Sequence, residues 1–396
     1  MMPPLRPATL AGVTMQAARR GVTRGGRVGF FRKTLKINLA LQGGGAHGAF
    51  TWGVLDRLLE EETLKIGWIS ATSAGSVNAV ALAAGLAESG AQGAREKLRE
   101  VWHAVHEAGV PDLMRLNPFL FSLTRSSFSQ MTGMMSPYEF NPMGFDPLRR
   151  LLERSIDFAR IRASQQELLI AATEVATGKA RLFKRHELTV ECVLASACLP
   201  TLHRAVEIGG KAYWDGGFSA NPALVDLARE SAVADTLLVM LNPTVKPELP
   251  TGAREIAGHV NHLTFNAPLR RDVEMIETLR REPGGGLRHR HSLSGRLKAH
   301  RFHLIDAGRY TSMLKPETKM KPDWGLFTYL HGAGRTETHK WLDRHRTDVG
   351  RRDTAKLAER FLGAGQVGAD PRPGVVDPLA GERAVTAAMM RRASIS

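Results

Sequence analysis

Ser73 is the first residue of this chain whose surroundings indicate chemistry. It lies in the segment 69–76 (ISATSAGS), between a short apolar run and a stretch of small residues with helical character. This order predicts a strand, a tight turn and a helix, which is the setting of a nucleophilic serine. Ala71 stands where the pattern G-x-S-x-G has its first glycine, and Gly75 keeps the second. Because alanine fits that place when its φ is negative, we expect Ser73 to be a nucleophile.

A glycine-rich loop precedes this serine. The alternating run 37–41 (INLAL) predicts a strand, and Gly43, Gly44 and Gly45 follow it before a helical pattern begins. Free N–H groups at the start of a helix suit a negative charge, such as the oxyanion of a tetrahedral intermediate. Residues 43–48 also match the dinucleotide pattern G-x-G-x-x-G. The acidic residue which that pattern requires after the second strand is missing, so we favour an oxyanion loop.

Asp215, in the segment 213–217 (YWDGG), is the candidate base. An Asp-Gly pair is ordinarily a turn. Together with the serine turn and the glycine loop, however, it suggests a base: a carboxylate within hydrogen-bond reach of Ser73 could take the serine proton, provided that burial raises its pKa. The alternative is a triad in the chain order serine, acid, histidine. The order leaves that alternative open, because histidines follow the acid, among them His259, His262, His289, His300 and His303.

These three segments, in this order, resemble the patatin-like phospholipases. The resemblance runs from about residue 35 to 242 and more weakly to about 350, and it includes 195–200 (ASACLP), Trp214 and Asn221-Pro222. It implies an α/β protein, with a three-layer α/β/α fold and a mainly parallel central sheet. It also implies a Ser–Asp dyad that uses no histidine and no metal or cofactor.

The resemblance assigns roles to residues of this sequence. Ser73 is the expected nucleophile and Asp215 the expected base. The residues expected to hold the oxyanion or the substrate are Gly43, Gly44, Gly45 and Ala74. Two positions depart from the family pattern. Ala71 replaces the first glycine of G-x-S-x-G, and His47 stands where many members have Arg or Lys, so that a neutral imidazole there supplies no fixed cation.

The implied reaction is hydrolysis of a lipid ester, of the phospholipase or lysophospholipase type. A neutral glyceride or an intracellular storage polyester offers the same kind of ester bond, so both remain alternatives. A third hypothesis is a catalytically idle lipid-binding scaffold, which the departures at Ala71 and His47 motivate.

Composition narrows the class of protein. The chain has 396 residues and a net charge of +15, and no apolar run approaches the length of a membrane span. Two cysteines, Cys192 and Cys198, make a disulfide framework improbable and favour a cytoplasmic protein. Aromatic residues make up 6% and no nucleic-acid motif occurs, so we expect no nucleic-acid partner. The oligomeric state is left open.

The N-terminal segment carries much of the positive charge. Residues 1–36 contain no acid and eight basic residues: Arg6, Arg19, Arg20, Arg24, Arg27, Arg32, Lys33 and Lys36. One interpretation is peripheral contact with an anionic inner-membrane surface; a targeting peptide and a passive tail are the others. We expect four parts: a basic flexible arm (1–34), a patatin-like catalytic domain (35–245), a C-terminal extension packed on it (246–362) and a disordered tail (363–396).

The remaining pattern predicts the elements of an α/β domain. Residues 109–147 are rich in Met, Phe, Pro and Ser, and they suggest either an irregular insertion or an apolar flap over an acyl groove. The expected strands and helices are strands near 66–69, 167–174, 181–184, 237–241 and 302–305, and helices over 77–87, 93–108, 190–197 and 251–281.

Overall fold

The structure is a computed structural model that describes residues 34–108, 136–141, 146–283, 292–314 and 316–363. The predicted arm and tail, and most of the predicted flap, lie outside the described residues.

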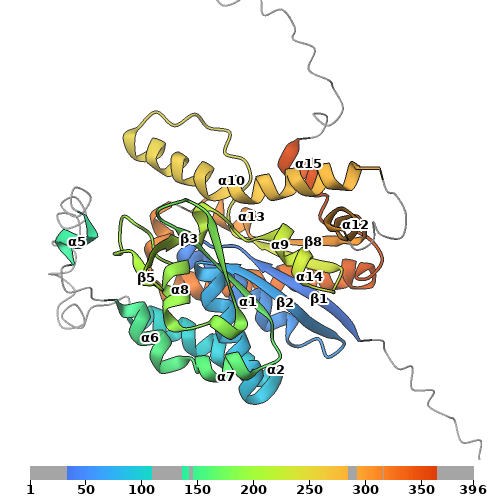
Figure 1. Cartoon of the computed structure of the whole chain (residues 1–396), viewed down its shortest axis with the longest axis horizontal. Coiled ribbons are helices and arrows are strands. Elements are labelled where there is room, and N and C mark those ends of the chain that lie inside the picture. Colours follow the sequence, from blue (N-terminus) through green and yellow to red (C-terminus); the bar gives the residue numbers. More distant parts are fainter. Residues whose placement is uncertain (1–33, 109–135, 142–145, 284–291, 315, 364–396) are drawn as a thin grey trace, which may run out of the picture. The chain divides into compact units, whose positions relative to one another are not determined.

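A mixed sheet of eight strands forms the centre of the described chain (Figure 1). Its order is β5-β6-β3-β2-β1-β7-β8, and β4 pairs with β3 off this path. The strands are β1 (Leu35–Leu41), β2 (Leu64–Thr72), β3 (Leu168–Glu174), β4 (Ala180–Lys184), β5 (Val206–Ile208), β6 (Lys211–Asp215), β7 (Asp235–Met240) and β8 (Arg301–Asp306).

Most of the sheet is parallel, as the sequence predicted. Strands β3, β2, β1, β7 and β8 run in one direction, whereas β4 and β6 are antiparallel to β3 and β5 is antiparallel to β6. The antiparallel pair β5 and β6 was not predicted. It places Asp215 at the end of a strand rather than in a loop. The carboxyl ends of parallel strands share one edge, and this edge carries the glycine loop after β1 and Ser73 after β2.

Helices cover both faces of the sheet. The helices of the described chain are α1 (Ala49–Leu58), α2 (Ala74–Ala108), α5 (Pro137–Phe140), α6 (Pro147–Ser155), α7 (Phe158–Ala163), α8 (Val190–Ser196), α9 (Leu224–Glu230), α10 (Ala253–Arg281), α12 (Leu293–Ala299), α13 (Gly308–Thr311), α14 (Trp324–His345) and α15 (Leu357–Leu362), of which α5 has no place on the sheet. Short 3-10 turns are η1 (Gly45–Gly48), η2 (Arg185–Glu187), η3 (Gly216–Phe218), η4 (Pro316–Met320) and η5 (Arg346–Asp348).

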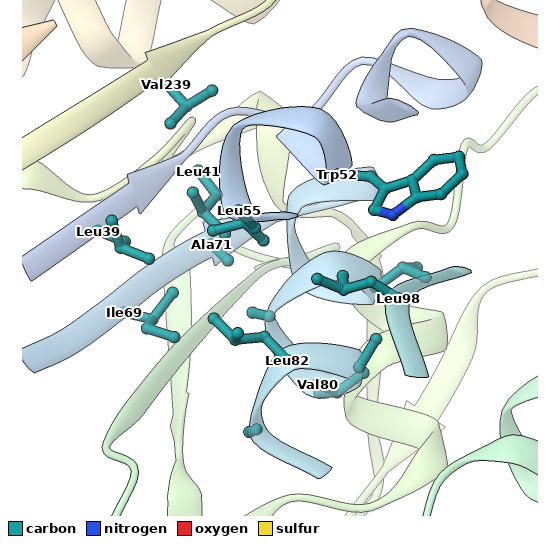
Figure 2. Packing of buried hydrophobic residues seen from close by; sticks show 14 of the residues in the cluster. Leu39, Leu41, Trp52, Leu55, Ile69, Ala71, Val80, Leu82, Leu98 and Val239 are labelled. Carbon is teal, nitrogen blue, oxygen red and sulfur yellow. The ribbon is translucent and has the colours of Figure 1, made fainter. Parts of the chain in front are cut away.

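Two apolar cores separate the helices into layers. Leu39 and Leu41 of β1 belong to a core that includes α1, α2, α8 and α14, whereas Ala40, between them, belongs to a core with α9, α10, α12 and α15. Alternate residues of a strand point to opposite faces, so the sheet is buried on both sides. Figure 2 shows the first core, in which Leu41, Ala71 and Leu55 lie together. The described elements thus form the three-layer α/β/α fold.

The segment after residue 245 is built into the same sheet and core. Strand β8 pairs with β7, and α14 packs along α1. The two helices approach at glycines, because a Cβ at Gly334 would overlap the Phe50 carbonyl oxygen. The C-terminal extension therefore shares its core with the elements that carry Ser73.

Candidate active site

Ser73 occupies the turn between β2 and α2 in a left-handed conformation, with φ of 54°. Among the described non-glycine residues, only Ser73 and Lys356 have positive φ, so Ala71 stays in ordinary strand conformation. Alanine is therefore compatible with the place that glycine holds in G-x-S-x-G. A Cβ at Gly75, by contrast, would overlap the Leu41 carbonyl oxygen. Unfavourable φ at a polar side chain is frequent at active sites, since the fold must hold the residue there.

The strand register brings Asp215 to the level of Ser73. Thr72, the last residue of β2, pairs with Ala171, and the next residue of β3, Ala172, pairs with Asp215. Across β3, Asp215 is therefore level with the residue after Thr72, which is Ser73. The two side chains come from sites 142 positions apart in the sequence, and an alanine is the residue between them on β3.

The environment of Asp215 suits a proton acceptor. The residue is fully buried, and its Oδ1 accepts a hydrogen bond from the Gly217 N–H at 2.7 Å. Burial raises the pKa of this carboxyl to about 7, while the hydrogen bonds of Gly217 and of the Ser73 hydroxyl oppose that rise. The other oxygen, Oδ2, has no partner of standard hydrogen-bond geometry among the described residues. The Ser73 hydroxyl is thus near enough to affect the ionisation of Asp215, and a substrate-free site commonly holds such a bond long or poorly aligned.

The glycine loop borders the serine directly. A Cβ at Gly43 would lie 2.8 Å from the Ser73 Cβ. The Gly43 N–H itself is occupied, because it donates to Asn221 Oδ1 at 2.8 Å. The N–H groups of Gly44, Gly45 and Ala74 make no hydrogen bond to another described residue. Of the four predicted oxyanion donors, three are therefore available to a ligand and Gly43 is not.

Several residues that the sequence did not single out hold this arrangement. Ser196 Oγ accepts the Ser73 N–H at 2.9 Å. Thr72 Oγ1 donates to the Ala220 carbonyl, and Ser70 Oγ accepts the Ala223 N–H. These two bonds fasten the segment after Asp215 to β2. Their sequence signal is weak, because a buried serine or threonine at a strand end is common.

The described histidines make other contacts. His303 is fully buried and bonds to Asp235 Oδ1 and Thr354 Oγ1, while His300 bonds to Thr236. His262 contacts Asn266. No described histidine is hydrogen-bonded to Ser73 or to Asp215, and His289 lies outside the described residues.

A family model for the patatin-like phospholipases matches residues 39–227. The chain contains a patatin-like phospholipase domain. The matched range includes the glycine loop, Ser73 and Asp215, so the patatin-like domain carries all the residues of the candidate site. Patatin-like domains belong to lipid acyl hydrolases, which agrees in general terms with the reaction that the sequence predicted.

Two further comparisons concern the whole chain. Among solved structures, this chain is similar to VipD from Legionella pneumophila, at 14% identity and a TM-score of 0.39, over 82% of this chain and 73% of that one. A comparison with curated proteins gave no match.

The described residues contain neither a membrane-spanning helix nor a metal-binding cluster. No helix there combines the length and apolar character needed to cross a membrane. No group of three or more His, Cys, Asp or Glu side chains is placed there to hold a metal ion.

Proposed function

We propose that this protein is a serine hydrolase of lipid esters that works through a Ser73–Asp215 dyad. The observation that carries the proposal is the pairing of a serine in a left-handed turn with a fully buried carboxylate at the same level of the sheet. A pKa of about 7 makes Asp215 an effective base near neutral pH, because both of its protonation states are then accessible.

The proposed reaction has two halves. Ser73 Oγ attacks the ester carbonyl carbon while its proton passes to Asp215, and the resulting oxyanion accepts hydrogen bonds from the N–H groups of Gly44, Gly45 and Ala74. The tetrahedral intermediate then expels the alcohol, which takes the proton from Asp215. In the second half, Asp215 removes a proton from water, the hydroxide attacks the acyl-enzyme, and the proton returns to Ser73 as the acid leaves.

Labelling by a fluorophosphonate probe tests the nucleophile. We expect the wild-type protein to gain one covalent adduct on Ser73 and to hydrolyse a p-nitrophenyl ester. Ser73→Ala should lose both properties while keeping its circular dichroism spectrum. Ser219→Ala is a matched control, because Ser219 is half-buried near Asp215 and bonds to Thr173 Oγ1. An unlabelled and inactive wild-type protein would favour the idle lipid-binding scaffold. Full turnover by Ser73→Ala would show that Ser73 is not the nucleophile.

Histidine variants test the dyad against the triad. Alanine substitutions at His203, His259, His262 and His303 should each leave measurable turnover, although His303→Ala should lower stability because it breaks the contacts with Asp235 and Thr354. Asp215→Asn should lower kcat by on the order of a thousandfold or more, as the loss of a triad member does. A histidine variant as inactive as Asp215→Asn, yet folded, would replace the dyad by a triad.

A further inference from the structure

Lys319 lies on the glycine loop although it comes from the C-terminal part of the chain. It belongs to η4, and η4 contacts η1, the turn that begins at Gly45. The Lys319 carbonyl oxygen is packed against Gly45, so closely that a side chain at that position would overlap it. The backbone of Lys319 is therefore fixed on the loop that borders Ser73.

The Lys319 ammonium is linked to the glycine loop through Asn242. Its Nζ donates a hydrogen bond to Asn242 Oδ1, and Asn242 Nδ2 donates to the Gly43 carbonyl oxygen at 3.3 Å. Gly43 in turn borders Ser73. Two hydrogen bonds thus separate the ammonium from the loop residue that touches the nucleophile. A lysine ammonium has three N–H donors, and the bond to Asn242 uses one of them.

Lys319 has a second lysine nearby. Lys246, in the loop between β7 and α10, is close enough to lower the pKa of Lys319. Among the side chains that the structure describes, which do not include that of Glu317, no carboxylate forms an ion pair with Lys319 or Lys246. Burial, followed by Lys246, lowers the pKa of Lys319 to about 8, so the side chain is mostly charged at pH 7. Two neighbouring cations repel each other, and an anionic ligand would relieve that repulsion.

Two histidines near these lysines, His47 and His262, do not add charge. Burial, and then the field of Lys319, lowers the pKa of His47 to about 4. Burial, then Lys246, His259 and Lys319, lowers the pKa of His262 to about 4. Both imidazoles are therefore neutral at pH 7. The cation that His47 does not supply from within the glycine loop is present beside the loop on Lys319.

We propose that Lys319, assisted by Lys246, is the specificity-determining residue of the site and binds a phosphate group on the leaving-group side of the substrate. This proposal rests on the proposed ester hydrolysis and deepens it. A phosphate group accepts charge-assisted hydrogen bonds from an ammonium. A neutral glyceride has no group that would use the two free N–H donors in this way.

The test compares two substrates with the same acyl chain. Hydrolysis of oleoyl lysophosphatidylglycerol and of monooleoylglycerol is measured in matched detergent micelles, with p-nitrophenyl butyrate as a small uncharged ester. Lys319→Met should lower kcat/KM for the phosphate-bearing lipid by about tenfold or more, which corresponds to one charge-assisted hydrogen bond. Its kcat/KM for the two uncharged esters should change by less than about twofold. Lys319→Arg should restore most of the loss, and Lys65→Met, at an exposed lysine on β2, is the matched control.

The source of the phosphate is resolved by competition. If inorganic phosphate inhibits the wild type but not Lys319→Met, the site also binds free phosphate. If phosphate inhibits neither protein and only kcat/KM for the lysophospholipid differs between them, the site binds a lipid headgroup. Equal loss on all three esters would mean that Lys319 merely holds Asn242, and no loss on any ester would mean that it meets no ligand. Either result overturns the proposal. Failure of the proposed dyad would be recognised separately, because the wild-type protein would then not be labelled by the fluorophosphonate probe. In that case, calorimetry would compare the binding of phosphate and of the lysolipid by the wild type with their binding by Lys319→Met.

Discussion

Asn221 accepts the Gly43 N–H on its Oδ1 at 2.8 Å, and its Nδ2 donates to the Phe265 carbonyl oxygen at 2.9 Å. This side chain is fully buried. It therefore joins the glycine loop to the segment that follows Asp215 and to α10. Since Gly43 N–H is bound there, Asn221 orients the loop rather than leaving that donor for the oxyanion.

Removing this amide should affect turnover more than substrate binding. In Asn221→Ala, the buried Gly43 N–H loses its partner, and we expect kcat to fall by about tenfold or more with little change in KM. The melting temperature should also fall. Asn261→Ala, on the exposed side of α10, is the control and should behave like the wild type. An Asn221→Ala protein with unchanged kcat would show that the loop keeps its geometry without this bond.

The pH dependence of the reaction follows from Asp215. The base acts as a carboxylate, and burial raises its pKa to about 7. We therefore expect kcat/KM for a p-nitrophenyl ester to fall as the pH decreases through about 7 and to level off above it. Initial rates measured in stopped assays between pH 5 and 9, corrected for spontaneous hydrolysis of the ester, would show this dependence. A profile flat down to pH 5 would contradict a base with a raised pKa.

Burial of the Asp215 carboxylate should make the wild-type protein less stable than the inactive variant Asp215→Asn at alkaline pH. When the pKa of a carboxyl is higher in the folded than in the unfolded state, the folded protein becomes less stable as the pH rises from the unfolded-state pKa to the folded-state pKa. A rise from 3.8 to about 7 corresponds to an upper limit of roughly 4 kcal/mol. Asp215→Asn should therefore be more stable than the wild type in urea at pH 8, and the difference should shrink toward pH 4.

The exposed acid Asp343 offers the control for that comparison. Asp343→Asn should change the free energy of unfolding by less than about 0.5 kcal/mol at either pH. If Asp215→Asn were no more stable than Asp343→Asn at pH 8, the carboxylate would not be costly to bury.

Packing of the C-terminal extension on α1 depends on Gly334. Its added Cβ in Gly334→Ala would overlap the Phe50 carbonyl oxygen, so α14 must move away from α1. We expect a loss of more than about 2 kcal/mol in the free energy of unfolding, or a low soluble yield. Gly332→Ala lies two residues away on the same helix with no atom within 4 Å of the new Cβ, and it should be neutral or stabilising by up to about 1 kcal/mol. Equal melting temperatures of the two variants would disprove close packing here.

The basic arm can be tested apart from the catalytic site, although residues 1–33 lie outside the described part. Each cation near an anionic surface contributes about 1 kcal/mol, and salt screens the effect. Deleting residues 1–34 should weaken co-sedimentation with anionic vesicles at low salt, while hydrolysis of a soluble ester stays nearly unchanged. Equal co-sedimentation of the two proteins would mean that the basic arm is a passive tail or a targeting segment.

Local patterns in the sequence were enough to predict the main elements of the fold. Alternating or continuous apolar runs identified β1, β2, β3, β7 and β8, because burial of a strand depends on its own side chains. The turn around Ser73 and the Asp-Gly-Gly segment were recognisable for the same reason, since small residues at fixed spacing report backbone geometry within a few positions.

Contacts between distant segments were decided by the tertiary structure. The register of β3 with β6 places Asp215 level with Ser73, and the Asn221 amide removes Gly43 from the predicted oxyanion donors. Lys319 reaches the glycine loop from more than 270 positions downstream. No spacing in the sequence encodes such a contact, because it depends on how β7, η4 and the loop after β1 pack together once the sheet has formed.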